Sequence, residues 1–138
     1  MPSEFLGSIA HTRGLSIAIA ARPDLVDGVG IDIERATPAR PRLERRILTA
    51  SEQSTIGSLP PLTRWTATLS LFCAKEAAFK ALDARVNVDL TFKKLEANPA
   101  VGALQCLQVV GSSTTAIVAV SRDAELVIAV AAFRRRAR

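Results

Sequence analysis

A long helical segment, flanked on both sides by short strands, is the feature that most constrains how this chain folds. The segment begins at Pro60-Pro61 and extends to about Ala84, with apolar side chains along one stripe. Before and after it, apolar residues alternate with small or polar ones, which is typical of half-buried antiparallel strands. This order predicts an α+β protein, in which a mostly antiparallel sheet packs against one long helix.

Turns rich in glycine, proline, serine or aspartate separate the predicted strands. In chain order, the strands are expected at about residues 5–9, 15–22, 29–34, 104–110, 116–121 and 126–133. Thr49 and Glu52 have the spacing of a capping box, which predicts a short helix that ends by Gly57.

The length of 138 residues is sufficient for a real core, and we assign residues 1–138 to a single domain. Apolar residues make up 49% and charged residues 22% of the chain, which is a globular composition. Cys73 and Cys106 are too few for a disulfide framework and favour a reducing cytoplasm. No apolar run approaches the roughly 20 residues of a membrane helix, so we expect no membrane partner.

The formal net charge is +5, and much of the basic charge lies in two clusters. These clusters are Arg35, Arg40, Arg42, Arg45 and Arg46, and then Arg134, Arg135, Arg136 and Arg138. Such a field favours polyanionic partners. Nucleic acid is one such class, but the aromatic content is 4% without any tyrosine, so stacking platforms are scarce and specific nucleic-acid binding is not expected.

Two carboxylates on the third predicted strand indicate a metal site. Val29, Ile31 and Ile33 are expected to form the core face of this strand, which places Asp32 and Glu34 together on the other face. Residues two positions apart on a strand lie roughly 6.5 to 7 Å from each other. Their carboxylates could therefore converge on one divalent cation.

The long helix carries a glutamate inside its apolar stripe. At about 100° per residue, the stripe contains Trp65, Leu69, Phe72, Glu76 and Phe79. A carboxylate placed there loses hydration and needs a compensating charge. Lys80, one turn further along, and Lys75, beside the stripe, supply such charges.

Taken singly, each motif has an ordinary explanation. Asp-x-Glu at the end of a strand is usually a solvated edge, and Glu followed by Lys four residues later is usually a surface pair. Their conjunction favours a site whose oxygen ligands select a hard cation such as Mg²⁺, with substrate phosphate oxygens completing the coordination. We therefore predict a phosphate-handling site.

These segments resemble the signature of the 4'-phosphopantetheinyl transferases, a Gly-x-Asp strand followed by a helix with the pattern Phe-x-x-Lys-Glu-x-x-x-Lys. The strand motif is Gly30-Ile31-Asp32, and the helix motif spans residues 72–80. The segment 7–11, Gly-Ser-Ile-Ala-His, is similar to a third motif, of the enterobactin-synthase type, except that Ala10 stands where the family often has serine. The resemblance implies one half of that family's fold.

The resemblance implies that Asp32, Glu34 and Glu76 hold a magnesium ion, with Glu76 and Lys80 as catalytic residues. In the family, the serine hydroxyl of an apo carrier protein attacks the β-phosphorus of coenzyme A, and 3',5'-ADP leaves. Glu76, or a water ordered by the metal, takes the serine proton. Phosphoryl transfer depends mainly on positioning and on neutralising the phosphate charge, which agrees with these residue types.

The resemblance also assigns the residues that bind coenzyme A. Lys75 and Lys80 are expected to contact its diphosphate, and His11 a phosphate of its nucleotide. An acidic acyl or peptidyl carrier protein is the expected second partner.

The resemblance places the matched motifs in the second half of the two-half members of this family, and it implies that the N-terminal half is absent. The short holo-acyl-carrier-protein-synthase subtype is a homotrimer, but its Gly-x-Asp motif lies near the N-terminus, whereas 31 residues precede Asp32 here. A shortened two-half enzyme is therefore favoured. Its activity would require self-association, as a homo-oligomer, to rebuild the pocket. The alternative is a non-catalytic remnant or interaction module that retains binding of metal or coenzyme A, or only the fold.

Overall fold

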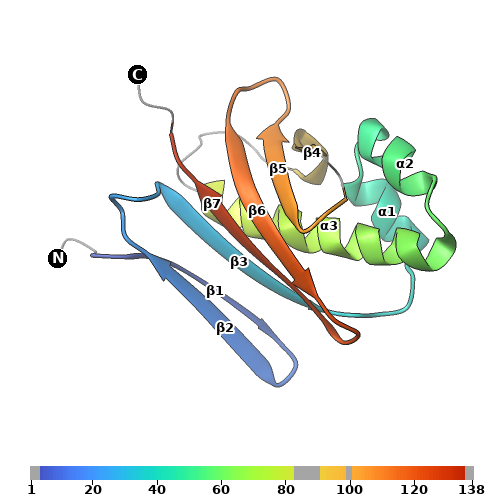
Figure 1. The fold of residues 1–138 in the computed structure, drawn as a ribbon, viewed down its shortest axis with the longest axis horizontal. Helices are drawn as coiled ribbons and strands as arrows, with labels where there is room; N and C mark the ends of the chain where they lie inside the picture. Colours follow the sequence, from blue (N-terminus) through green and yellow to red (C-terminus); the bar gives the residue numbers. More distant parts are fainter. Residues whose placement is uncertain (1–3, 83–90, 99–100, 136–138) are drawn as a thin grey trace.

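Antiparallel strands form two sheets in the computed structural model, which describes residues 4–82, 91–98 and 101–135 (Figure 1). The smaller sheet is a hairpin of β1 (Leu6–Thr12) and β2 (Leu15–Ala21). The larger sheet contains, in spatial order, β3 (Gly28–Arg35), β7 (Leu126–Phe133), β6 (Thr115–Arg122), β5 (Leu104–Val109) and β4 (Leu95–Asn98). Each strand of this sheet is antiparallel to its neighbours.

One long helix, α3 (Pro61–Leu82), covers one face of the larger sheet, as Figure 1 shows. The short helices α1 (Pro41–Ile47) and α2 (Ala50–Gly57) lie near the beginning of α3, and the 3₁₀ helix η1 (Phe92–Lys94) precedes β4. This arrangement confirms the predicted α+β class. In the described residues, no helix combines the length and the apolar character needed to cross a membrane.

The capping box is confirmed at the start of α2. Thr49 Oγ1 accepts a hydrogen bond from the Glu52 backbone N–H, and the Glu52 carboxylate accepts one from the Thr49 N–H. Each interaction satisfies a backbone donor that the helix itself leaves free.

The predicted strands are present, but α1 and β4 were not predicted. In α1, Pro41 stands at the start of a short helix rich in arginine, which has no apolar periodicity to reveal it. The β4 strand has four residues and lies at the sheet edge, so it is too short for its alternation to be recognised. The predicted end of the long helix, at Ala84, falls outside the described residues.

Both faces of β3 are covered, whereas the sequence predicted a single core face. Ile31 and Ile33 form a small second core with Ala10 of the hairpin. The opposite face of β3 packs against α3, which carries the main core together with β5, β6 and β7. Alternation on β3 therefore separates two buried environments, and the acidic side chains lie on the α3 side.

Candidate functional site

Two glycines allow β3 and α3 to pack in direct backbone contact. A Cβ atom added to Gly28 would lie 1.9 Å from the carbonyl oxygen of Ala81, and one added to Gly30 would lie 1.9 Å from that of Ala77. A side chain at either position would force the helix outward. The next residues on this face of β3 are acidic, so the close approach brings them against the middle of α3.

Asp32 is buried at this contact, with 8% of its surface exposed. Its Oδ1 lies 3.8 Å from Lys80 Nζ, while Oδ2 is buried without a hydrogen-bond partner among the described residues. Burial raises the pKa of Asp32, and the Cys73 thiol and the Lys80 ammonium oppose that rise. A bound cation would satisfy the oxygen that has no donor.

Glu34 and Glu76 are half-buried, and the charge of Asp32 affects the pKa of each. Burial, and then the negative charges of Asp32 and Glu76, raise the pKa of Glu34 to about 7. Burial and the charge of Asp32 also raise the pKa of Glu76, whereas Lys80 lowers it. The carboxyl groups therefore lie close enough to repel one another, and a divalent cation would relieve this repulsion.

The carboxylate oxygens of this site are suitable ligands for a hard cation. In the part of the chain that the structure describes, no group of three or more His, Cys, Asp or Glu side chains forms a ready-made metal centre. Mg²⁺ commonly uses one or two protein carboxylates and takes its remaining oxygens from water and substrate phosphates. Asp32 and its neighbours Glu34 and Glu76 are the residues that would hold it here.

Lys80 joins the hairpin to β3 beside these carboxylates. Its Nζ donates to the backbone carbonyls of Ile31 at 2.8 Å and Ile9 at 3.2 Å. Ser8 Oγ accepts a hydrogen bond from the Ile31 N–H at 3.0 Å, so the segment of the third motif is attached to the edge of β3. About a third of the Lys80 side chain, 34%, remains exposed, which leaves its charge accessible to an anion.

His11 is not brought into contact with the carboxylates. The neighbouring Ala10 packs into the small core beneath the hairpin, at 5% exposure. Because successive side chains of a strand point to opposite faces, His11 points away from that core and is exposed, opposite Ser16 of β2. Its contact with a nucleotide phosphate stays a prediction.

Lys75 is buried away from the carboxylates of β3, and its contact with the diphosphate stays a prediction. Its side chain is completely buried and forms an ion pair with Glu52, with 2.7 Å between Nζ and Oε1. Desolvation lowers the pKa of Lys75, and the Glu52 carboxylate opposes that change. The burial has a simple cause, since the face of α3 that flanks the apolar stripe is covered by α2 and η1 rather than open to solvent.

Two site residues were missed by sequence reasoning. Glu52 was assigned only to the capping box, and its pairing with a residue 23 positions away left no local signal. Arg40, just before α1, lowers the pKa of Glu34 by its charge. It was counted only as part of a basic cluster, although its position soon after the strand motif was a usable clue.

The pKa of Glu34 predicts a dependence of stability on pH. The folded state holds this proton more tightly than the unfolded chain, where the ordinary value is 4.5. Stability without a divalent cation should therefore fall as the pH rises from about 4.5 to about 7. We expect a loss of about 1–2 kcal/mol, allowing for partial exposure. Thermal unfolding in chelator should show this loss, and Glu34→Gln should reduce it; an unchanged slope would contradict the assignment.

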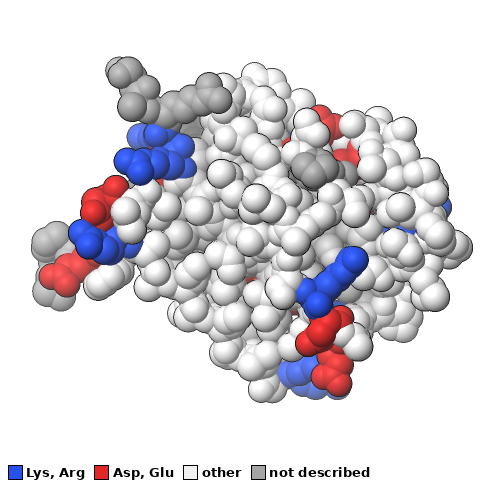
Figure 2. All heavy atoms as spheres, viewed as in Figure 1, with Lys and Arg blue, Asp and Glu red and all other residues white. Residues whose placement is uncertain are grey.

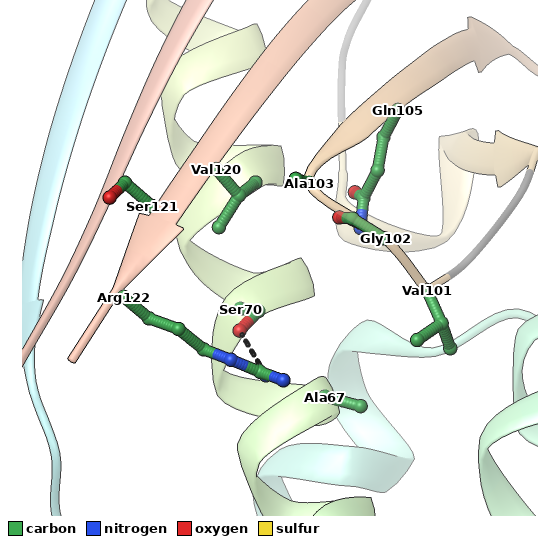
Figure 3. Close-up of a pocket in the computed structure, with 9 residues that line it drawn as sticks. All are labelled: Ala67, Ser70, Val101, Gly102, Ala103, Gln105, Val120, Ser121 and Arg122. Carbon is green, nitrogen blue, oxygen red and sulfur yellow. Dashed lines mark hydrogen bonds between the residues drawn. The ribbon is translucent and has the colours of Figure 1, made fainter. Parts of the chain in front are cut away.

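A separate cavity of about 370 Å³ lies between α3 and the ends of β5 and β6 (Figure 3). In it, Arg122 Nη1 donates to Ser70 Oγ at 3.2 Å. Among the described residues that line this cavity there is no carboxylate, so it is distinct from the acidic site on β3.

The sheet face opposite α3 is largely uncharged. Figure 2 shows that Lys, Arg, Asp and Glu side chains gather at the margins of this view, around a broad area that carries none. Leu104 on β5 and Ile117 on β6 are 65% and 58% exposed. Cys106, which is opposite Ile117 in the strand register, is also exposed.

Comparison with solved structures finds the same fold. Holo-[acyl-carrier-protein] synthase of Thermotoga maritima is 26% identical, with a TM-score of 0.63 over 80% of this chain and 65% of that one. This chain therefore spans slightly less than two thirds of that relative. A holo-(acyl-carrier-protein) synthase of Bacillus anthracis, solved in complex with CoA (3',5'-ADP), is 23% identical, with a TM-score of 0.62 over 80% of this chain and 98% of that one. No curated protein sequence matches.

The family comparison covers the elements that build the acidic site. The sequence model of the 4'-phosphopantetheinyl transferase superfamily matches residues 28–131, from the first residue of β3 into β7. The match includes Asp32, Glu34, Glu76 and Lys80, and it leaves out the hairpin that carries His11. The chain belongs to the 4'-phosphopantetheinyl transferase superfamily.

Proposed function

We propose that this protein transfers the 4'-phosphopantetheine group of coenzyme A to a serine of an apo acyl or peptidyl carrier protein, with Mg²⁺. The observation that carries the proposal is the set of mutually repelling carboxyl groups of Asp32, Glu34 and Glu76 beside Lys80, in a chain of this superfamily. The similar synthase of Bacillus anthracis was solved in complex with CoA (3',5'-ADP). That complex supports coenzyme A as the donor here.

In the proposed reaction, the carrier serine oxygen forms a bond to the β-phosphorus of coenzyme A as the bond to the bridging oxygen breaks. The products are the phosphopantetheinyl carrier and 3',5'-ADP. Glu76, or a water ordered by the metal, would accept the serine proton as the general base. Lys80 lies at the rim of the site and would neutralise a phosphate oxygen. Bound Mg²⁺ would supply further charge neutralisation at the phosphates.

The expected carrier is acidic, and the surface next to the site suits it. Arg40, Arg42, Arg45 and Arg46 are exposed on and just before α1, which follows the β3 strand that holds Asp32. Opposite charge on the partner would steer the encounter toward the site. We expect this reaction to take place in a reducing cytoplasm, in agreement with the free thiols of Cys73 and Cys106.

Incubation of the purified chain with apo carrier protein, coenzyme A and Mg²⁺ is expected to add one phosphopantetheine to the carrier. Intact-mass spectrometry measures this directly, and omission of Mg²⁺ with chelator present should abolish it. No mass increase at high protein concentration would reject the activity for this chain.

The second candidate is a non-catalytic remnant that keeps binding of metal or coenzyme A. The burial of Lys75 favours it, because one of the two cations expected on the diphosphate is occupied by Glu52. Titration calorimetry separates the two functions. Mg²⁺-dependent binding of coenzyme A without transfer would support the remnant, whereas transfer would exclude it.

A further inference from the structure

The buried ion pair of Lys75 and Glu52 uses every donor of the lysine. Besides the bond to Glu52 Oε1, Lys75 Nζ donates to the backbone carbonyls of Ile47 at 2.6 Å and Phe92 at 2.9 Å. An ammonium group has three hydrogens, so none is left for a phosphate. Both side chains are completely buried.

Both carboxylate oxygens of Glu52 also accept hydrogen bonds from the backbone. Its Oε1 also accepts a hydrogen bond from the Thr49 N–H, and Oε2 accepts one from the Ala97 N–H, each at 2.8 Å. The pair therefore connects α3 with the end of α1, the start of α2, η1 and β4. A buried ion pair adds little net stability compared with an apolar pair of similar volume, so its value here lies in fixing how these elements are arranged.

Phe92 connects the ion pair with the face of α3 that holds Glu76. Its carbonyl is held by Lys75, and its ring packs against Phe72 and Phe79, with ring centroids 5.5 and 5.2 Å apart. Phe72 and Phe79 lie four residues before and three residues after Glu76, and residues at these spacings share one face of a helix. The Phe92 ring therefore packs on the stretch of α3 that includes Glu76.

We infer that Lys75 is a positioning residue, which acts with Glu52 to hold Phe92 against the face of α3 that carries Glu76. Lys75 binds neither substrate nor metal in this assignment. The catalytic part of the inference rests on the proposed function, whereas the structural part rests only on the contacts described above. For Lys75 to reach a phosphate, its ammonium would have to leave three partners and abandon a buried carboxylate.

The test is a cycle of Lys75→Met, Glu52→Gln and the double variant. Each single change leaves a buried polar group without its partner, so each should lower the melting temperature and kcat. The double variant also removes the unpaired buried carboxylate, so it should recover part of the loss in melting temperature. It should not recover kcat, because the Phe92 carbonyl still lacks its donor. The KM for coenzyme A should stay within threefold of the unmodified protein throughout. Lys93→Met, which removes an exposed lysine of η1, is the matched control. It should change neither the melting temperature nor kcat.

A diphosphate-binding role gives the opposite pattern. Lys75→Met would then raise the KM for coenzyme A tenfold or more with little loss of stability, and Glu52→Gln would restore nothing. This outcome would overturn the inference.

A structural measurement distinguishes failure of this inference from failure of the proposed function. Contacts between the Phe92 ring and the rings of Phe72 and Phe79 are measurable by NMR without any substrate. They should be lost or altered in Lys75→Met and also in the double variant, which still lacks the donor to the Phe92 carbonyl, whether or not the protein catalyses transfer. Unchanged ring contacts in Lys75→Met would overturn the inference even in an active enzyme.

Discussion

Replacement of Asp32 by asparagine is expected to lower the rate of phosphopantetheine transfer by roughly 100-fold or more, the scale of losing one preorganised electrostatic group. Asparagine keeps the shape of the buried side chain but removes the charge that faces Lys80 and the other carboxyl groups. The pKa of Glu34 and that of Glu76 should then both fall, because the charge of Asp32 contributes to raising each of them. Transfer rates and a Mg²⁺ titration measure the effect.

Asp24→Asn is the matched control for this variant. Asp24 forms an exposed ion pair with Arg22, outside the acidic site. The Asp24→Asn variant should therefore leave the rate of phosphopantetheine transfer unchanged. Retention of more than half the activity by Asp32→Asn, with the same Mg²⁺ dependence, would show that the carboxyl groups were assigned to the wrong role.

Replacement of Gly30 by alanine is expected to destabilise the fold by about 3 kcal/mol, or roughly 10 °C in melting temperature. The new Cβ would lie 1.9 Å from the Ala77 carbonyl oxygen and 2.8 Å from the Ala81 nitrogen. Both are backbone atoms, so relief requires α3 to move away from β3. That movement separates Glu76 from Asp32, and transfer should be lost along with stability.

Gly57→Ala provides a control with the same chemical change. Apart from its chain neighbours and its own helix backbone, no atom of the described residues lies within 4 Å of a Cβ built at Gly57, which ends α2. Its melting temperature should stay close to that of the unmodified protein. A Gly30→Ala variant that melts within about 2 °C of the unmodified protein would show that the contact between β3 and α3 can relax cheaply.

The sequence was sufficient to predict the elements with strong periodicity or local chemistry. The long helix, the strands on each side of it and the capping box at Thr49 follow from patterns within short windows. The β4 strand was missed because four residues at a sheet edge carry too little alternation. Its position depends instead on pairing with β5.

The acidic site was predicted better than its surroundings. Asp32 and Glu34 follow from strand alternation, and Glu76 from its place in an apolar stripe, and the three influence one another in the structure. Their role as magnesium ligands stays a prediction. The burial of Lys75 could not be foreseen, since it depends on Glu52 and on Phe92, whose positions are set by tertiary packing.

The two cysteines differ in a way that matters for handling the protein. Cys73 is buried, and burial raises the pKa of its thiol, whereas Cys106 is exposed on the uncharged sheet face. A maleimide dye should therefore label Cys106 selectively in the folded state. Samples stored without reductant can cross-link through that thiol, so any measurement of subunit stoichiometry needs dithiothreitol or a Cys106→Ser background.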